Sequence, residues 1–176
     1  KNKSQQKSVL NVSPGSWIEP VSIGEGEGSI GRGTAVDSEN RVHVVSQKRG
    51  PDNGGAFYSG SDDFGETWEK EQRISETGVF VLNPNIAIGK DDSVHIAWVE
   101  RTAEGTAIFY RNSQDHGQTW SSVIQVTEYG NQTLSSPAIA ADSNGRVHIA
   151  WHEGAPEEPS TVSRVFYARS IDNGKT

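Results

Sequence analysis

The stretch SDDFGETW at residues 61–68 decides the fold, because it returns twice further along the chain. It reappears as SQDHGQTW at 113–120 and, in part, as SIDNGKT at 170–176. The copies share the pattern Ser-x-Asp-x-Gly-x-Thr, followed by Trp in the first two. The shared residues are Ser61, Asp63, Gly65, Thr67 and Trp68; Ser113, Asp115, Gly117, Thr119 and Trp120; and Ser170, Asp172, Gly174 and Thr176.

The residue types in this pattern predict a tight turn between two strands. Glycine tolerates the positive φ that such a turn requires. The Asp two residues earlier can accept hydrogen bonds from the backbone N–H groups of the turn, and the Ser and Thr hydroxyls can bond the rest. We therefore expect these carboxylates to be structural rather than catalytic acids or Ca²⁺ ligands. Trp68 and Trp120 should pack against a neighbouring sheet, at a cost of about 3–5 kcal/mol if either is cut to Ala.

A repeat of about 50 residues connects the three copies. Trp17, Trp68 and Trp120 are separated by 51 and 52 residues, and equivalent histidines recur at 43, 95 and 148. Each unit contains short apolar runs punctuated by Gly, Asn and Asp, which is typical of β-strands and not of helices. The expected strands lie at 34–36, 42–45 and 56–58; at 85–88, 94–98 and 108–110; and at 138–141, 147–151 and 165–167. This period with four short strands per unit predicts an all-β propeller.

The repeated motif resembles the Asp box of the bacterial neuraminidase repeat, found in sialidase-like β-propellers. We call the copies Asp box 1 (61–68), Asp box 2 (113–120) and Asp box 3 (170–176). The resemblance implies four-stranded antiparallel blades and an extracellular or periplasmic location. We expect three blades in the chain, at about 33–75, 85–127 and 137–176, after a flexible arm at 1–14. The third blade would lack its outer strand, and residues 15–23 resemble that strand.

The ends of the predicted units are complementary, and they predict an assembly. Three blades cannot close a ring, because closed propellers have about 4–8. Two chains placed head to tail would make six blades, with residues 15–23 of each completing the third blade of the other. The sequence therefore predicts a homodimer that closes a six-bladed ring.

The loops opposite the Asp boxes are the expected place for a ligand, since propellers usually bind there. The resemblance implies that a sialidase-like glycoside hydrolase would need three Arg, a Tyr nucleophile with a Glu partner, and an Asp acid. Those residue types occur at Arg32, Arg49, Arg101, Tyr129, Glu100, Glu153 and Asp52. All but Asp52 are our candidate ligand-rim residues. The early Arg-Ile-Pro segment of the family is missing, and the chain covers half of six blades.

Composition excludes several classes of function. The net charge of -7 and the lack of a basic stripe argue against nucleic-acid binding. No run of about 18 apolar residues occurs, so no membrane span is expected. With no Cys there are no disulfides or thiolate metal sites, and a chain without Met is expected to be a processed protein or an excised piece.

Three functions remain open from the sequence. The first is a non-catalytic propeller that binds a glycan or another extracellular ligand, whose hydroxyls suit Trp, Tyr, Asn and acidic side chains. The second is a sialidase-like glycoside hydrolase, and the third a self-assembling unit without activity. No cofactor or metal is expected. We interpret His43, His95 and His148 as partly buried residues whose ring nitrogens bond neighbouring backbone.

Overall fold

A computed structural model describes most of the chain. The described residues are 17, 19–24, 28–29, 33–50, 53–131, 133–134, 137–154 and 163–175. The expected arm at 1–14, and the residues Arg32, Asp52 and Thr176, lie outside this part of the chain. Within the described residues no helix is long and apolar enough to cross a membrane.

The chain folds into three antiparallel sheets that follow one another in sequence. The first contains β1 (Gly28–Ser29), β2 (Thr34–Val36), β3 (Val42–Lys48), β4 (Gly55–Ser61) and β5 (Gln72–Arg73). The second contains β6 (Phe80–Ile88), β7 (Val94–Thr102), β8 (Gly105–Ser113) and β9 (Ile124–Gln125), with the 3-10 turn η1 (Lys90–Asp92) after β6. The third contains β10 (Thr133–Leu134), β11 (Ala138–Ala141), β12 (Val147–Gly154) and β13 (Ser163–Ser170).

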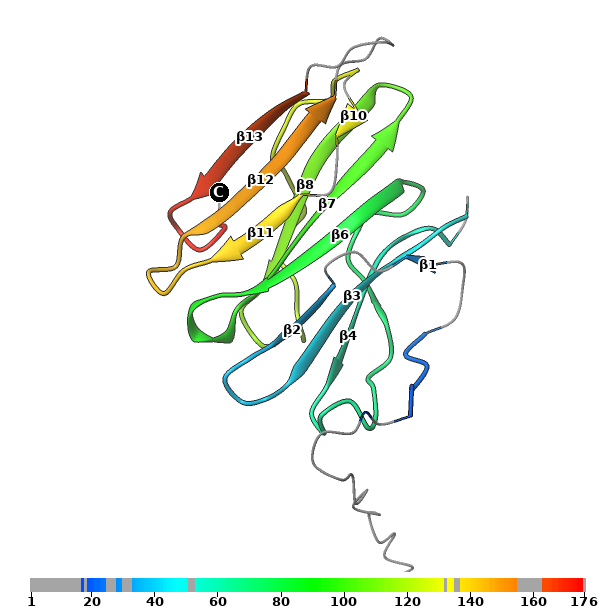
Figure 1. Cartoon of the computed structure of the whole chain (residues 1–176), viewed down its shortest axis with the longest axis vertical. Coiled ribbons are helices and arrows are strands. Elements are labelled where there is room, and N and C mark those ends of the chain that lie inside the picture. The colour runs from blue at the N-terminus through cyan, green and yellow to red at the C-terminus, as the bar shows by residue number, and fades with distance from the viewer. Residues whose placement is uncertain are drawn as a thin grey trace, which may run out of the picture.

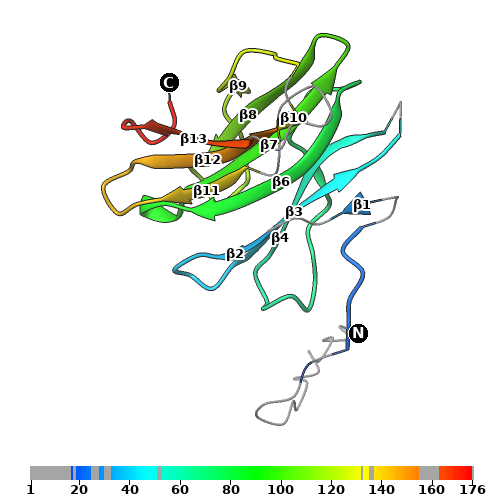
Figure 2. The same cartoon turned by 45° about the horizontal axis from the view of Figure 1, so that its top comes forward.

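The second sheet lies between the other two (Figures 1 and 2). One apolar core fills the space between the first and second sheets and contains Tyr58, Ile96, Trp98 and Phe109. The other core, between the second and third sheets, contains Val99, Tyr110, Ile149 and Trp151. Alternate residues of β7 thus enter opposite cores, which is why its first seven residues are all buried.

The strands predicted from the repeat are present, and β2 and β11 have the expected bounds. In each sheet, further pairing with the second strand precedes the predicted first strand. β1 and β2 both pair with β3, β10 and β11 both pair with β12, and β6 shifts register between Leu82 and Asn85. No sequence pattern predicted β1 and β10, which are only two residues each. Residues 17 and 19–23, the described part of the predicted outer strand 15–23, are in no strand.

The equivalent histidines bond side chains, so the interpretation that they bond backbone was wrong. Nδ1 of His43, His95 and His148 lies 2.8, 2.6 and 2.7 Å from a tyrosine hydroxyl of the next strand. The other ring nitrogen of His95 lies 2.9 Å from Ser93 Oγ, whose own hydroxyl donates to the Lys90 carbonyl. His95 therefore donates to Ser93. Burial lowers the pKa of His95, so the ring is neutral and its Nδ1 accepts from the Tyr110 hydroxyl.

Candidate functional site

The carboxylates of the Asp boxes accept hydrogen bonds from their own turns. Asp115 accepts the Thr119 N–H at 2.8 Å, the Thr119 hydroxyl at 2.5 Å and the Ser113 hydroxyl at 2.7 Å. Asp63 makes the same three contacts in Asp box 1. Burial acts to raise the pKa of Asp115, but the hydrogen bonds from Thr119 and Ser113 outweigh it and lower this pKa. In Asp box 3 the Ser170 hydroxyl and the Lys175 N–H donate to Asp172.

The glycines of Asp boxes 2 and 3 meet the preceding sheet. Gly117 has φ +88° and Gly174 φ +73°, and a Cβ at either position would overlap the hydroxyl of Tyr58 or Tyr110. Trp120 packs edge-on against Tyr58, with ring centroids 5.0 Å apart. We call the contact of Asp box 2 with Tyr58 joint 1, and that of Asp box 3 with Tyr110 joint 2. Trp68, in Asp box 1, instead donates from its indole to the Gly65 carbonyl at 3.1 Å.

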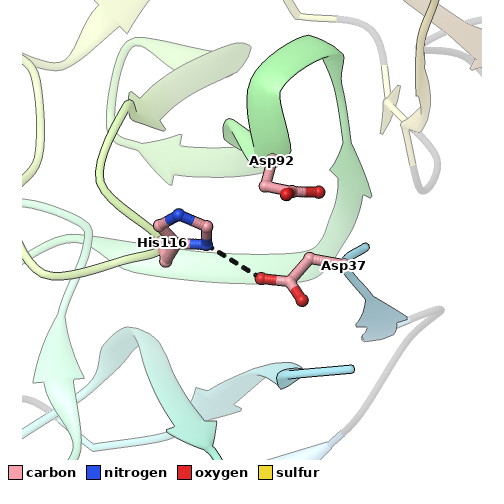
Figure 3. Close-up of side chains that lie close together, drawn as sticks. All are labelled: Asp37, Asp92 and His116. Carbon is pink, nitrogen blue, oxygen red and sulfur yellow. Dashed lines mark hydrogen bonds and ion pairs between the residues drawn. The ribbon is translucent and has the colours of Figure 1, made fainter. Parts of the chain in front are cut away.

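Beside joint 1, Asp37, Asp92 and His116 come together from three different turns (Figure 3). One ligand atom from each lies within 4.8 Å of the others. Imidazole and carboxylate groups suit Zn²⁺ or Mn²⁺ among the divalent metals, so these are the residues that could hold an ion. Asp37, however, already accepts from the Glu39 and Arg41 N–H groups at 3.0 and 2.9 Å. Its other oxygen lies 2.9 Å from His116 Nδ1 and 3.2 Å from His43 Nε2.

The protonation states in this cluster are consistent with hydrogen bonds that connect two sheets. The pKa of Asp37 is lowered, since the bonds from His116, Arg41 and His43 outweigh the opposing effect of burial. The hydrogen bond to Asp37 raises the pKa of His116, whereas burial lowers that of His43. An imidazolium at His116 and a neutral His43 can thus share one Asp37 oxygen. The arrangement ties Asp box 2 to the β2–β3 turn.

The predicted rim residues lie at the other end of the strands. In the second sheet Val94 pairs with Ser113, the first residue of Asp box 2, whereas Arg101 pairs with Thr106 at the opposite end. Arg49 follows β3 directly, and Glu153 lies near the end of β12, so both are at the end that does not carry the Asp boxes. Tyr129 lies next to Gly130, which bridges to Thr106. Arg32 is outside the described residues.

Glu100 is buried, and it does not face solvent as a polar strand end would. Only 3% of its surface is exposed, and its carboxylate accepts the Trp98 indole N–H at 2.8 Å. Burial, reinforced by the nearby charge of Glu76 and opposed by the bond from Trp98, raises the pKa of Glu100. The third sheet repeats this contact, where Trp151 donates to Glu153 at 3.1 Å.

Tyr129 belongs to the same neighbourhood as Glu100. Its ring centroid lies 6.0 Å from that of Phe109, which faces the core between the first and second sheets. Burial raises its pKa, and so do the charges of Glu100 and Glu104. Glu100 and Tyr129, a protonatable carboxyl and a phenol, thus lie at the same end of the second sheet. Such a pair can donate and accept hydrogen bonds to ligand hydroxyls, and it can transfer a proton.

The role of Trp98 and Trp151, the tryptophans of the central strands β7 and β12, was not predicted from the sequence. Trp98 stacks on Phe109 and Trp151 on Phe166, with interplanar angles of 20° and 16°. Each indole then directs its N–H to the carboxylate two residues later. The recurring Trp-x-Glu spacing at 98–100 and 151–153 was the available signal, because residues i and i+2 of a strand share a face.

Arg49 lies on a different surface of the protein from Glu100. It lines a hollow of about 1120 Å³ on the outer face of the first sheet, together with Lys48, Phe57 and Arg73. Lys48 Nζ and Arg73 Cζ each lie 4.8 Å from the centre of the Phe57 ring. The equivalent of Phe57 in the second sheet is Phe109, which is buried against the first sheet. The hollow is thus the face that a preceding sheet would cover.

Comparison with solved structures identifies the architecture. The chain superposes on the structure "Hadza microbial sialidase Hz136" with a TM-score of 0.62 over 82% of its length, at 15% identity. The chain has the sialidase-like β-propeller fold. An α-L-arabinanase from Penicillium chrysogenum, complexed with arabinobiose, matches with a TM-score of 0.59 over 80% of the chain, at 16% identity. A polysaccharide lyase of family PL25, an ulvan lyase, matches with a TM-score of 0.59 over 81%, at 11% identity.

These matches concern the fold alone. The chain spans 35%, 45% and 41% of the sialidase, the arabinanase and the lyase, respectively, which is less than half of each. No family model and no curated protein matches this propeller sequence. The all-β expectation and the sialidase-like propeller expectation are therefore confirmed at the level of architecture. These structural neighbours include enzymes that act on carbohydrates.

Proposed function

We propose that this chain is a carbohydrate-binding β-propeller unit that acts outside the cytoplasm. Its ligand site lies at the end opposite the Asp boxes, around Glu100 and Tyr129. The observation that carries the proposal is the buried Glu100, whose carboxylate accepts from Trp98 at the same end of the sheet as Tyr129 and whose pKa is raised by burial. Perturbed titratable groups concentrate at functional sites, and none of the cations in the described part of the chain forms an ion pair with Glu100.

The chemistry of this end suits a polyhydroxylated ligand. Carboxylates accept hydrogen bonds from sugar hydroxyls, a protonated carboxyl or phenol donates them, and aromatic rings pack against the apolar faces of sugars. Arg101 is exposed on the same strand end and offers a guanidinium to an acidic sugar. The carbohydrate-active neighbours of the fold support the same ligand class.

The test is a binding titration with two sugars of different charge, N-acetylneuraminic acid and arabinobiose, followed by NMR shifts of backbone amides. We expect amides near residues 99–102 and 128–130 to shift, and Glu100→Gln and Tyr129→Phe to weaken binding at least about tenfold. Glu66→Gln, at the exposed end of Asp box 1, is the matched control and should bind normally. Shifts confined to residues of the Asp boxes would overturn the proposal.

A sialidase-like hydrolase is the second candidate, favoured by the presence of Tyr129 and Glu100 at the same end of the second sheet. In that reaction the Tyr129 oxygen would bond to the anomeric carbon as the leaving group departs with the bonding electron pair, and the phenolic proton would pass through the Glu100 carboxylate to the leaving group. Water would then bond to the anomeric carbon in place of Tyr129, and its proton would return to the tyrosine oxygen. Release of fluorophore from a fluorogenic sialoside, abolished by Tyr129→Phe, would favour hydrolysis. Binding without any turnover by the assembled protein would favour the non-catalytic function.

A further inference from the structure

Joints 1 and 2 have a common plan. In each, a tyrosine of one sheet is buried beneath the glycine of the next Asp box. In joint 1 the Tyr58 hydroxyl also lies 3.1 Å from the His116 carbonyl. In joint 2, Asn112 donates to the carbonyl of Asn173, the residue equivalent to His116, at 2.8 Å. The same contact thus joins the first sheet to the second and the second to the third.

The third sheet carries the tyrosine half of this joint without a partner in the described chain. Tyr167 holds the same position against His148 as Tyr110 holds against His95, with ring centroids 6.0 Å apart in both pairs. Its surface is nevertheless 58% exposed, whereas Tyr58 and Tyr110 are buried. Val165, on the same strand, is also exposed.

The first sheet carries the complementary half. Gly65 has φ +88°, like Gly117, but a Cβ there would meet nothing within 4 Å except the Trp68 side chain of its own box, at 3.6 Å. Phe64, which corresponds to His116, is 74% exposed. Gly65 therefore has the geometry of a joint glycine without a tyrosine above it.

The side chains that meet across the joints match one another in chemistry. In joint 2 the second residue of Asp box 2 meets the fourth residue of Asp box 3, where Asn173 donates to Gln114 at 2.9 Å. In joint 1 the equivalent residues are Asp62 and His116, and Arg41 bonds both the Asp62 carboxylate and the His116 carbonyl. The remaining pair is Ile171 and Phe64, both apolar and 72% and 74% exposed. A third joint would bury these two against each other.

We infer that a second copy of this chain docks through that third joint. Phe64 and Gly65 of one copy cover Ile171 and Tyr167 of the other. One chain cannot make this contact itself, because the second sheet separates the first from the third (Figures 1 and 2). The interface continues the joints already present inside the chain. Two copies of three sheets give six, within the range of about 4–8 for closed propellers, and a two-fold axis repeats the joint twice. This partner goes beyond the proposed ligand function and does not depend on it.

The first test is sedimentation of the whole chain, which should show twice the 19.1 kDa of one chain at micromolar concentration. Phe64→Lys and Ile171→Asp, each alone, should raise the dissociation constant at least about tenfold, because each places a charge against an apolar residue. In the double variant, the new Lys of one copy meets the new Asp of the other. This variant should therefore recover most of the affinity that each single variant loses. A folded single chain, a series of larger open oligomers, or a double variant weaker than both singles would overturn the proposal.

The second test uses the absence of cysteine from the chain. A short bismaleimide should link Phe64→Cys/Ile171→Cys chains into covalent dimers. The control Glu104→Cys/Ile171→Cys places its first thiol on the exposed β7–β8 turn, at the other strand end, and should remain single chains. Equal cross-linking of the two variants would refute the joint, whatever the sugar-binding result.

Discussion

Tyr58 covers the backbone of Gly117 so closely that no side chain would fit between them. The turn glycine of Asp box 2 is therefore required twice, once for its φ of +88° and once for its contact with the neighbouring sheet. A motif that looks local in sequence also builds the interface between two sheets.

Gly117→Ala should lower the free energy of unfolding by about 2–4 kcal/mol, through strain at positive φ and overlap with the Tyr58 ring. Gly78→Ala is the matched control, because Gly78 has φ +81° with nothing within 4 Å of a Cβ. It should cost only about 1 kcal/mol, from φ alone. Chemical denaturation of both variants measures the difference. Equal losses in the two variants would show that the contact with Tyr58 does not contribute to the free energy of unfolding.

Gly65→Ala should affect association more than the fold of one chain. Its Cβ meets only Trp68 within the chain but would meet Tyr167 of a second copy. We expect the dissociation constant measured by sedimentation to rise at least about tenfold, with Gly78→Ala unchanged. If both variants associate like the parent chain, Gly65 does not lie at an interface.

Asp115→Asn should destabilise the protein by about 1–3 kcal/mol, because the amide replaces one of the oxygens that accept from Thr119 and Ser113. Sugar binding should remain, since Asp115 lies at the other end of the strands from Glu100. Thermal melting and the sugar titration together check this, with exposed Asp91→Asn as the control. Lost binding at an unchanged melting temperature would contradict the structural role.

Acid should destabilise the fold through His95. Burial lowers its pKa from 6.5 to about 4. Between these values the unfolded chain binds a proton that the folded chain does not, so stability falls as the pH drops from 6.5 to 4. A pKa shift of this size corresponds to about 3 kcal/mol in the free energy of unfolding. Urea unfolding at pH 7 and pH 4.5 should show this loss, and His95→Gln should reduce it. An equal loss in the His95→Gln variant would show that His95 is not its source.

His116 acts in the opposite direction over a different range. The hydrogen bond to Asp37 raises its pKa, so its contribution is complete below pH 6.5 and is lost as the pH rises through its folded pKa. Asp37, with a lowered pKa, contributes above pH 3.8 and loses this contribution as the pH falls through its folded pKa. Between pH 6 and pH 8, the free energy of unfolding should therefore fall less in the His116→Gln variant than in the parent chain. An unchanged slope over that range would argue against the ion pair.

The repeated turns made the architecture predictable, because each signal was local. Gly117 and Asp115 carry their turn geometry in their own chemistry, and the period of the motif gave the order of strands. The environment of Glu100 was not predictable in this way. Its burial depends on Trp98 and on the approach of the first sheet, and neither is encoded at position 100 itself. The side-chain partners of His95 were missed for the same reason, since Tyr110 is distant in sequence.

The contact of Asp boxes 2 and 3 with the sheet before each of them matters while the chain is being synthesised. Tyr58 leaves the ribosome before Gly117, and Tyr110 before Gly174, so each new turn finds its docking surface already synthesised. Assembly can therefore keep pace with translation from the first sheet onward. Asp box 1 has no earlier sheet within the described chain, and it emerges first. In the proposed dimer, Asp box 1 docks last, because its partner is the third sheet of another completed copy.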